Sequence, residues 1–358
     1  MKMTLLRRIL VIILVICIAL PLGAQRIQTF DTDGNPVGYV TVLGSEGNII
    51  GMTDLDGILA DVKGATSVTV THVAFKTQTV NVASLQNGRI VMQDADYSLP
   101  EITIAQKDYI YVQTYYRVIY MWDDTLVYYR AGVTDNTYNI KKKTVKSDHE
   151  HFSMAESGAI KFALNSIAGK AISKRSDLPT SNLCLNSQST RFTLTPETPG
   201  RQRVNYKDRH VGFLIDDAAA HERRLSLDRG LLRSIIATET GKKASKRDAR
   251  RINRDESWCA VYRLDEDGNC RVEDFVMSQM HSDEDTYRTY LKKYVHTRMW
   301  VEVYTTDRAY VDKKELKERK RNNRVSMTFD ALQQFETSHN IPALPVKMQQ
   351  IIVEMASK

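Results

Sequence analysis

The sequence predicts a mainly β sandwich at the amino-terminal end, followed by an α+β domain built on an antiparallel sheet. Two observations support this fold class. Short β-branched runs lie between Gly and Asp turn signals up to residue 105. Beyond that residue, long aromatic runs of strand character alternate with segments of helical periodicity. A chain of roughly 330 residues beyond a leader segment has the length of two domains.

The front domain contains two clear strand patterns, Tyr39–Leu43 and Ser67–Val73. Between them, Asp54–Gly57 has the composition of a tight turn. The Asp54 carboxylate can accept hydrogen bonds from backbone amides further along the chain, and Gly57 can adopt positive φ without steric cost. After Leu99 and Pro100, Glu101–Ala105 is expected to be the last strand of the sandwich.

Three motifs follow each other in this region: Asp-Gly-x-Pro-Val (Asp33–Val37), Thr-Asp-x-Asp-Gly (Thr53–Gly57) and a strand, Val70–Thr77. In this order they resemble the carboxypeptidase regulatory-like domain, a family found in envelope proteins of Bacteroidetes-type bacteria. The resemblance covers about residues 26 to 105. It implies a seven-stranded transthyretin-like, Ig-like sandwich without catalytic residues. Two positions depart from the family pattern, since Arg26–Phe30 replaces the opening Gly-x-Val strand and Ala74-Phe75 replaces Gly-Tyr.

The first 24 residues have the composition of a secretory signal peptide. Three basic residues precede the apolar run Ile9–Leu20, and small residues follow as far as Ala24, where we expect cleavage. A retained membrane anchor would need about 20 apolar residues. The sequence therefore predicts an exported protein, located in the periplasm or at the outer membrane, with no transmembrane span in the mature chain.

Charge is unevenly distributed between the predicted domains. Residues 25–105 contain nine Asp and Glu against four Lys and Arg, whereas residues 106–358 have a net charge of +9. A basic domain outside the cytoplasm favours an anionic lipid or glycan surface, or an envelope protein, as its partner, and argues against nucleic acid. Solvated helix faces remain an alternative explanation for the same charges.

The second domain, residues 106–358, belongs to no family that its sequence identifies. Its strand patterns are Tyr109–Tyr120, Leu126–Arg130, Asn136–Lys141, Arg191–Leu194, Gln202–Asp208, Val211–Ile215 and Met299–Tyr304. Helices are expected at Ser153–Ser173, Leu225–Thr238, around Thr286–Val295, and at Met327–Phe335 and Val346–Met355. The tyrosine-rich strand, Tyr109–Tyr120, can be a ligand-binding face, but packing within a sheet explains it as well.

Three further segments of the second domain have a distinctive composition. Ser176–Gly200, rich in Ser, Thr, Asn and Pro, is expected to be a loop. Trp258–Leu264 and Cys270–Val276 flank a strong turn signal and predict a hairpin in which Val276 lies opposite Cys259. Lys242–Arg254 contains seven Lys or Arg and predicts an exposed helix or mobile loop, and Lys313–Arg324 is a second basic run.

Two groups of residues have the chemistry of metal ligands. One is the run Asp148, His149, Glu150 and His151; the other combines His281, Asp283 and Glu284 with His296. Asp-x-Asp-Gly occurs three times, beginning at Asp31, Asp54 and Asp265, but turn chemistry explains it better than calcium, because no 12-residue loop ending in Glu is present. Neither a His-Glu-x-x-His motif nor a nucleophile elbow nor a Gly-rich phosphate loop occurs.

Three cysteines lie beyond the predicted leader: Cys184, Cys259 and Cys270. The expected hairpin register separates Cys259 from Cys270 by about 20 Å along the ladder, at ~3.3 Å per residue. These two should therefore not pair with each other, and any disulfide would need Cys184.

The sequence as a whole favours a non-catalytic protein of the cell envelope that acts by binding, and it assigns no catalytic, cofactor-binding or metal-binding residues and no cofactor. The alternative is a periplasmic metal-dependent hydrolase with its metal at His281, Glu284 and His296.

Overall fold

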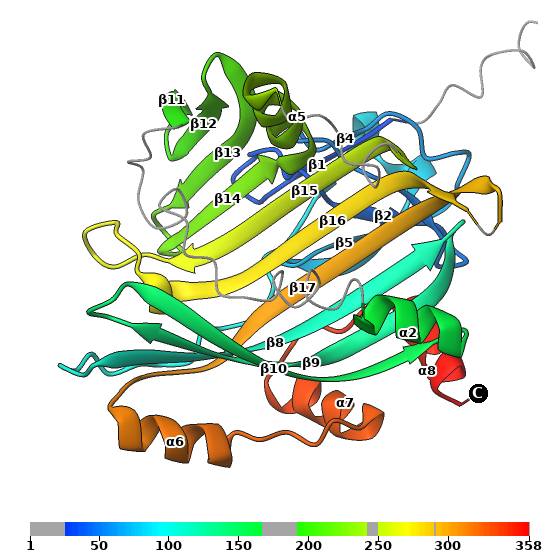
Figure 1. Ribbon diagram of the computed structural model, residues 1–358. Coiled ribbons are helices and arrows are strands. Elements are labelled where there is room, and N and C mark those ends of the chain that lie inside the picture. Colours follow the sequence, from blue (N-terminus) through cyan, green and yellow to red (C-terminus); the bar gives the residue numbers. More distant parts are fainter. Residues whose placement is uncertain (1–25, 167–191, 242–249, 290, 358) are drawn as a thin grey trace, which may run out of the picture. The chain divides into compact units, whose positions relative to one another are not determined.

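The computed structural model describes residues 26–166, 192–241, 250–289 and 291–357 (Figure 1). The predicted leader and Cys184 lie outside them. The chain forms two compact units: within the described residues, the first comprises 26–70 and 78–92, and the second comprises 71–77 and 93–357. The structure is mainly β, with large antiparallel sheets, as the sequence predicts.

Residues 27–91, most of which belong to the first unit, form seven strands in two sheets. One sheet has the order β4-β1-β7 and the other β3-β2-β5-β6. The strands are β1 (Ile27–Phe30), β2 (Thr41–Leu43), β3 (Ile49–Met52), β4 (Ile58–Leu59), β5 (Ser67–His72), β6 (Phe75–Asn81) and β7 (Arg89–Val91), and the 3-10 helices η1 (Val82–Ser84) and η2 (Gln86–Gly88) lie before β7. Glu101–Ala105 is not a strand, so that expectation was wrong.

The Asp-x-Asp-Gly turns have the geometry that the sequence predicts. In each, the first carboxylate accepts from the backbone N–H groups two and four residues later, at 3.0 and 2.8 Å for Asp54. Asp31 and Asp265 make the same pair of bonds, at 3.1 and 2.8 Å. The Gly of each motif has a φ of 75 to 84°. Glycine is required at Gly57, because a Cβ would lie 2.6 Å from the carbonyl oxygen of Thr29.

The second unit is organised around one ten-stranded antiparallel sheet with the order β10-β9-β8-β17-β16-β15-β14-β13-β12-β11. Its strands are β8 (Tyr109–Trp122), β9 (Thr125–Asn139), β10 (Thr144–Ala155), β11 (Phe192–Thr198), β12 (Arg201–Tyr206), β13 (Arg209–Asp217), β14 (Glu222–Asp228), β15 (Arg251–Arg263), β16 (Phe275–Arg288) and β17 (Lys293–Val311). The 3-10 helix η4 (Val272–Asp274) precedes β16. The sheet curves markedly across its width (Figure 1).

Helices cover this sheet at several places. α5 (Arg229–Thr240) lies against β13 and β15, and α2 (Gly158–Ser166) against β9 and β10. Three carboxyl-terminal helices, α6 (Lys313–Asn322), α7 (Phe329–Ser338) and α8 (Val346–Ala356), pack near β8, β9 and β10 (Figure 1). The helices expected at Met327–Phe335 and Val346–Met355 are thereby confirmed.

Both faces of β8 are buried, and this explains its tyrosine-rich sequence. Val112, Tyr116 and Val118 join an apolar core that also contains Leu231 and Ile235 of α5. The alternate residues Tyr115 and Arg117 contact α7 instead. The two sets point to opposite faces because side chains alternate along a strand. The tyrosines therefore serve sheet packing, as one of the two sequence interpretations holds.

Several predicted elements were wrong, mostly because strands extend into polar sequence. The helix expected around Thr286–Val295 was wrong, because Thr286–Arg288 ends β16 and Lys293–Val295 begins β17. Of the exposed helix or loop predicted at Lys242–Arg254, residues 242–249 lie outside the described part, and Arg251–Arg254 begins β15 instead. Leu225–Asp228 completes β14, so the expected helix starts later, at Arg229.

The remaining differences concern strand length and register. Leu126–Arg130 and Asn136–Lys141 belong largely to one strand, β9. Of the helix expected at Ser153–Ser173, Ser153–Ala155 ends β10, α2 covers Gly158–Ser166, and residues 167–173 lie outside the described part. The predicted loop Ser176–Gly200 contains β11, while residues 176–191 lie outside the described part. In the β15–β16 pair, Cys259 lies opposite Gln279 instead of Val276.

A buried ion pair links two neighbouring strands of the sheet, β8 and β17. Arg117 Nε donates to Glu302 Oε2 at 2.5 Å, and both side chains are almost fully buried, at 3% and 4% exposure. Arg117 also donates to the carbonyl oxygen of Pro342 at 2.8 Å and faces Glu336 Oε1 at 3.5 Å. Burial by itself would lower the pKa of Arg117, but Glu302 and the neighbouring groups raise it well above its ordinary value.

We therefore expect Glu302→Gln to destabilise the protein by about 3 to 5 kcal/mol, because it leaves the Arg117 guanidinium buried without its nearest counter-charge. Urea unfolding followed by circular dichroism measures the change. The double variant Arg117→Met/Glu302→Leu should lose clearly less than the sum of the two single substitutions. Additive losses would show that the two side chains are not coupled.

Candidate functional site

The first predicted metal cluster is divided between the two faces of β10. His149 and His151 alternate with Asp148 and Glu150, so the imidazoles and carboxylates point in opposite directions. His149 Nδ1 lies 2.9 Å from Thr134 Oγ1. The Asp148 carboxylate instead accepts a hydrogen bond from Lys320 Nζ of α6 at 2.8 Å. This bond holds the pKa of the Asp148 carboxyl below its ordinary value. The four residues do not form one site.

The second cluster fails for the same geometric reason. His281 and Glu284 are three residues apart on β16, and an odd spacing in a strand puts two side chains on opposite faces. His281 stacks on Trp300 with ring centroids 5.5 Å apart. Glu284 forms ion pairs with Arg251 and Arg254, both at 3.4 Å. The metal site proposed for the hydrolase alternative is therefore wrong.

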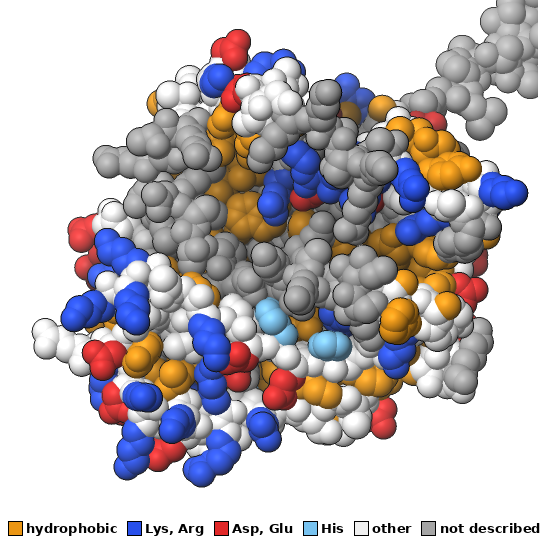
Figure 2. All heavy atoms as spheres, viewed as in Figure 1, with side chains coloured by type: hydrophobic (Ala, Val, Ile, Leu, Met, Phe, Trp, Pro, Cys, Tyr) orange, Lys and Arg blue, Asp and Glu red, His pale blue; other side chains and the backbone are white. Residues whose placement is uncertain are grey.

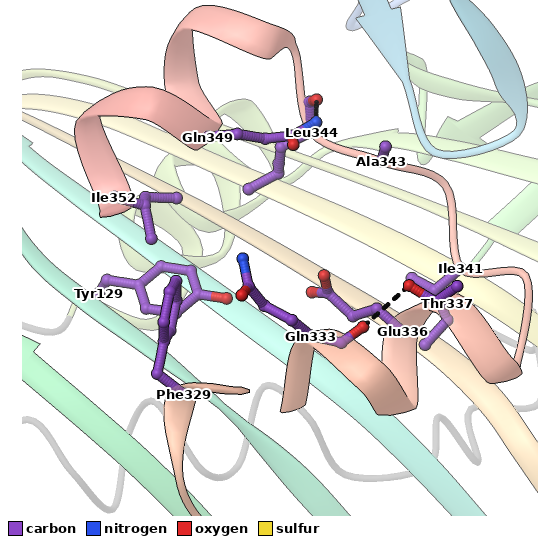
Figure 3. A pocket seen from close by; sticks show the side chains of 10 residues that line it. All are labelled: Tyr129, Phe329, Gln333, Glu336, Thr337, Ile341, Ala343, Leu344, Gln349 and Ile352. Atoms are coloured by element: carbon purple, nitrogen blue, oxygen red, sulfur yellow. Dashed lines mark hydrogen bonds between the residues drawn. The ribbon is translucent and has the colours of Figure 1, made fainter. Parts of the chain in front are cut away.

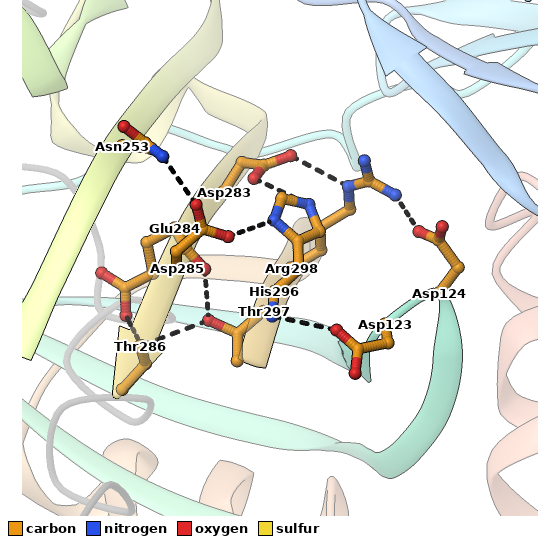
Figure 4. Close-up of polar contacts among 10 residues, drawn as sticks. All are labelled: Asp123, Asp124, Asn253, Asp283, Glu284, Asp285, Thr286, His296, Thr297 and Arg298. Carbon is orange, nitrogen blue, oxygen red and sulfur yellow. Dashed lines mark hydrogen bonds and ion pairs between the residues drawn. The ribbon is translucent and has the colours of Figure 1, made fainter. Parts of the chain in front are cut away.

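His296 lies in a polar network with two aspartates (Figure 4). Asp283 belongs to the cluster that the sequence grouped with His296, whereas Asp285 does not. Its Nδ1 is 2.9 Å from Asp285 Oδ1 and its Nε2 is 3.1 Å from Asp283 Oδ1. Arg298 bonds Asp283 and Asp124, so the network ties β16, β17 and the β8–β9 turn together. Within the described residues, no group of three or more His, Cys, Asp or Glu side chains is arranged to hold a metal ion.

The two described cysteines, Cys259 and Cys270, lack the features of a reactive thiol. Cys259 is buried in β15, and burial raises the pKa of its thiol to about 11, which disfavours the nucleophilic thiolate. Cys270 is buried near Arg223, whose guanidinium lies 3.8 Å from its sulfur. As predicted, Cys259 and Cys270 do not bond to each other.

A basic surface stands out on the second unit. It is formed by exposed cations of the β9–β10 turn and the start of β10, of α6, and of the segment just after α6: Lys141, Lys142, Lys143, Lys146, Lys313, Lys314, Lys317, Arg321 and Arg324. We call this set the basic face. In Figure 2, Lys and Arg side chains gather at the lower left, where Figure 1 places α6 and the β9–β10 hairpin.

The basic face is held in place by contacts at its base. The Asp312 carboxylate caps α6 by accepting from the backbone N–H groups of Lys314 and Glu315, at 2.8 and 2.9 Å. Arg319 pairs with Asp307 of β17 at 2.5 Å, and Lys320 with Asp148 of β10. These contacts use the inner cations of α6 and two carboxylates of the sheet. The outer cations remain turned to solvent.

The basic runs were visible in the sequence, but their combination was not. Lys141–Lys143 and Lys313–Arg324 lie far apart in the chain, and the sheet order brings them together. No local pattern in the sequence indicates this proximity, because the contacts that hold α6 on the sheet, such as Lys107 Nζ to Glu315 at 3.1 Å, join residues far apart in the chain.

Comparison with known proteins identifies no family. No family model matches the chain, and no curated protein matches it. A solved structure titled "Lipid-protein interactions in lipovitellin" is similar at 8% identity and a TM-score of 0.29, over 57% of this chain and 26% of that one. A TM-score this low does not indicate a shared fold. Among the described residues, no helix is long and apolar enough to cross a membrane.

The burial of His281 has a measurable consequence. Burial lowers its pKa from 6.5 to about 3, so the folded protein keeps this ring neutral while the unfolded chain takes up a proton below pH 6.5. The stability that comes from keeping the His281 ring neutral is complete above that pH and is lost as the pH falls toward 3. Between pH 7 and pH 5, protonation of His281 in the unfolded chain should lower the free energy of unfolding by about 2 kcal/mol.

We expect His281→Gln to reduce this pH-dependent loss by about 2 kcal/mol, as measured by urea unfolding at both pH values. His221→Gln, at an exposed histidine, is the control and should leave the loss unchanged. An unchanged loss in His281→Gln would mean that the ring is not held neutral in the folded protein.

Proposed function

We propose that this chain is an exported, non-catalytic protein of the cell envelope, and that the basic face binds a membrane surface carrying anionic phosphate groups. The observation that carries this proposal is the segregation of charge. Residues 106–358 have a net charge of +9, and nine exposed cations gather on α6 and the β9–β10 turn.

The neighbouring carboxylates neutralise only part of this surface. Asp148 bonds Lys320 and Lys146, and Glu315 bonds Lys107 and caps the start of α6. Glu318 is also exposed on α6, but the nine cations of the basic face outnumber these acidic groups. The outer lysines keep a positive field, which raises the local concentration of anions and steers association with an anionic surface.

The composition of α6 favours binding at the level of lipid headgroups. Its only large apolar residue is Leu316, which is half-buried. A helix that is polar on its solvent side has no apolar face to insert among acyl chains, in contrast to amphipathic membrane helices. Phosphate groups on lipids or lipopolysaccharide suit such a surface, because attraction to dispersed charges requires no groove.

The first unit supports the envelope setting through its resemblance to the carboxypeptidase regulatory-like domain. Its seven strands in two sheets and the turn at Asp54–Gly57 suit a transthyretin-like sandwich. In this proposal, the sandwich is a non-catalytic module, and it begins after a signal peptide cleaved at Ala24.

Replacing Lys142, Lys143, Lys314 and Lys317 together by Gln should weaken binding to phosphatidylglycerol vesicles at least about tenfold, since a basic residue near an anionic surface contributes about 1 kcal/mol. Vesicle co-sedimentation measures the binding. Wild-type binding should also fall as salt rises from 50 to 300 mM, because salt screens exposed charges.

The matched control replaces by Gln four exposed lysines that do not belong to the basic face: Lys63, Lys161, Lys292 and Lys347. It removes the same net charge and should bind nearly as the wild type does. Equal losses in both variants, or equal binding to phosphatidylcholine, would contradict a role for the basic face.

A further inference from the structure

A pocket of about 170 Å³ lies between α7, α8 and β9 of the second unit (Figure 3). Its rim includes Ala343, Thr337 and Gln349, all exposed. Its inner wall includes Tyr129, Phe329, Glu336 and Ile352. Since a water molecule occupies about 30 Å³ of the liquid, the space suits a ligand of roughly five to seven non-hydrogen atoms.

The charge of the inner wall is negative. Glu336 belongs to the buried network of Arg117, in which two carboxylates, Glu302 and Glu336, share one guanidinium. Arg117 is much closer to Glu302, at 2.5 Å, than to Glu336, at 3.5 Å. Tyr115 donates its hydroxyl to Glu336, which orients the carboxylate without neutralising it. Among the described residues of this network, one negative charge is therefore left over beside the pocket.

Aromatic rings form the wall next to this carboxylate. Tyr129 and Phe329 meet edge to face, with ring centroids 6.4 Å apart and planes at 83°. Figure 3 shows both rings at one end of the pocket, with Glu336 lying toward its centre. A carboxylate beside aromatic faces is the combination that attracts an organic cation, through ion pairing and cation–π attraction.

We propose that this pocket binds a small organic ammonium ion, with the charged nitrogen at Glu336 and the alkyl part against Tyr129 and Ile352. The proposal is independent of the basic face, which lies on α6 and the β9–β10 turn and attracts the opposite charge. An anionic ligand is disfavoured by Glu336. A neutral ligand of the same shape would leave the surplus negative charge uncompensated.

The test compares three ligands of nearly equal size at pH 7: butylammonium, 1-butanol and butyrate. Binding to the full mature chain is followed by NMR of the methyl groups of Ile352 and Leu344, both of which line the pocket. Butylammonium should shift these signals saturably and bind at least about tenfold more tightly than 1-butanol, and butyrate should not bind. Equal affinity for butylammonium and 1-butanol would overturn the proposal.

Two substitutions locate the site. Glu336→Gln should abolish the preference for butylammonium over 1-butanol, while Glu354→Gln, on the exposed side of α8, should preserve it. Ala343→Phe at the rim should block both ligands while leaving the side chains of Arg117, Glu302 and Glu336 unchanged. If Glu336→Gln does not fold, two results still test the proposal. The wild type must prefer butylammonium over 1-butanol, and Ala343→Phe must lose binding of both ligands. Full binding by Ala343→Phe would place the ligand elsewhere and contradict the proposal.

Discussion

The second unit depends on a guanidinium buried inside its sheet. Arg117 lies in the middle of β8, directly opposite Glu302 of β17, and both side chains are shielded from water. Removing such charges from water costs several kcal/mol for each ion, and attraction offsets this only when the remaining donors are also satisfied. Two of those remaining contacts come from outside the sheet, from Glu336 of α7 and from the carbonyl oxygen of Pro342. The carboxyl-terminal segment is therefore required to satisfy the remaining hydrogen-bond donors of the buried Arg117 guanidinium.

This requirement connects the fold to both proposed sites. α7 is held by Glu336 and by the contact of Phe335 with Tyr115, whose ring centroids are 5.8 Å apart. α6 is held by Arg319 on Asp307 of β17, and Asn323, just beyond it, bonds the same carboxylate. The ammonium pocket arises where α7 and α8 meet β9, and the basic face arises where α6 lies along the β9–β10 hairpin. A carboxyl-terminal segment detached from the sheet would lose both.

The sequence predicted elements whose signal is local. The three Asp-x-Asp-Gly turns, the long strand from Tyr109, and the helices α7 and α8 were found because one short pattern specifies each of them. Predictions failed where charged residues continue a strand, as in the β16–β17 hairpin. There, Asp285 pairs with His296 across the ladder, and a cross-strand pair leaves no periodic trace in the sequence.

The candidate sites were harder to predict than the strands, because their residues meet only through sheet order. Residues that could bind a metal and lie close in the sequence, such as His281 and Glu284, were misleading. In a strand, two side chains an odd number of residues apart point to opposite faces of the sheet. Glu336 and Tyr129, which line the pocket together, are 207 positions apart in the sequence. The burial of Arg117 was not predicted from the apolar, aromatic run around it, although a single charge in such a run indicates a buried polar network.

The most direct test of the binding function is a hydrogen–deuterium exchange footprint of the mature chain on phosphatidylglycerol vesicles. The account predicts slower exchange in α6 (Lys313–Asn322) and in the turn at Lys141–Lys143, with the strands of the first unit unaffected. Protection of the first unit, with none at α6 or the β9–β10 turn, would contradict it.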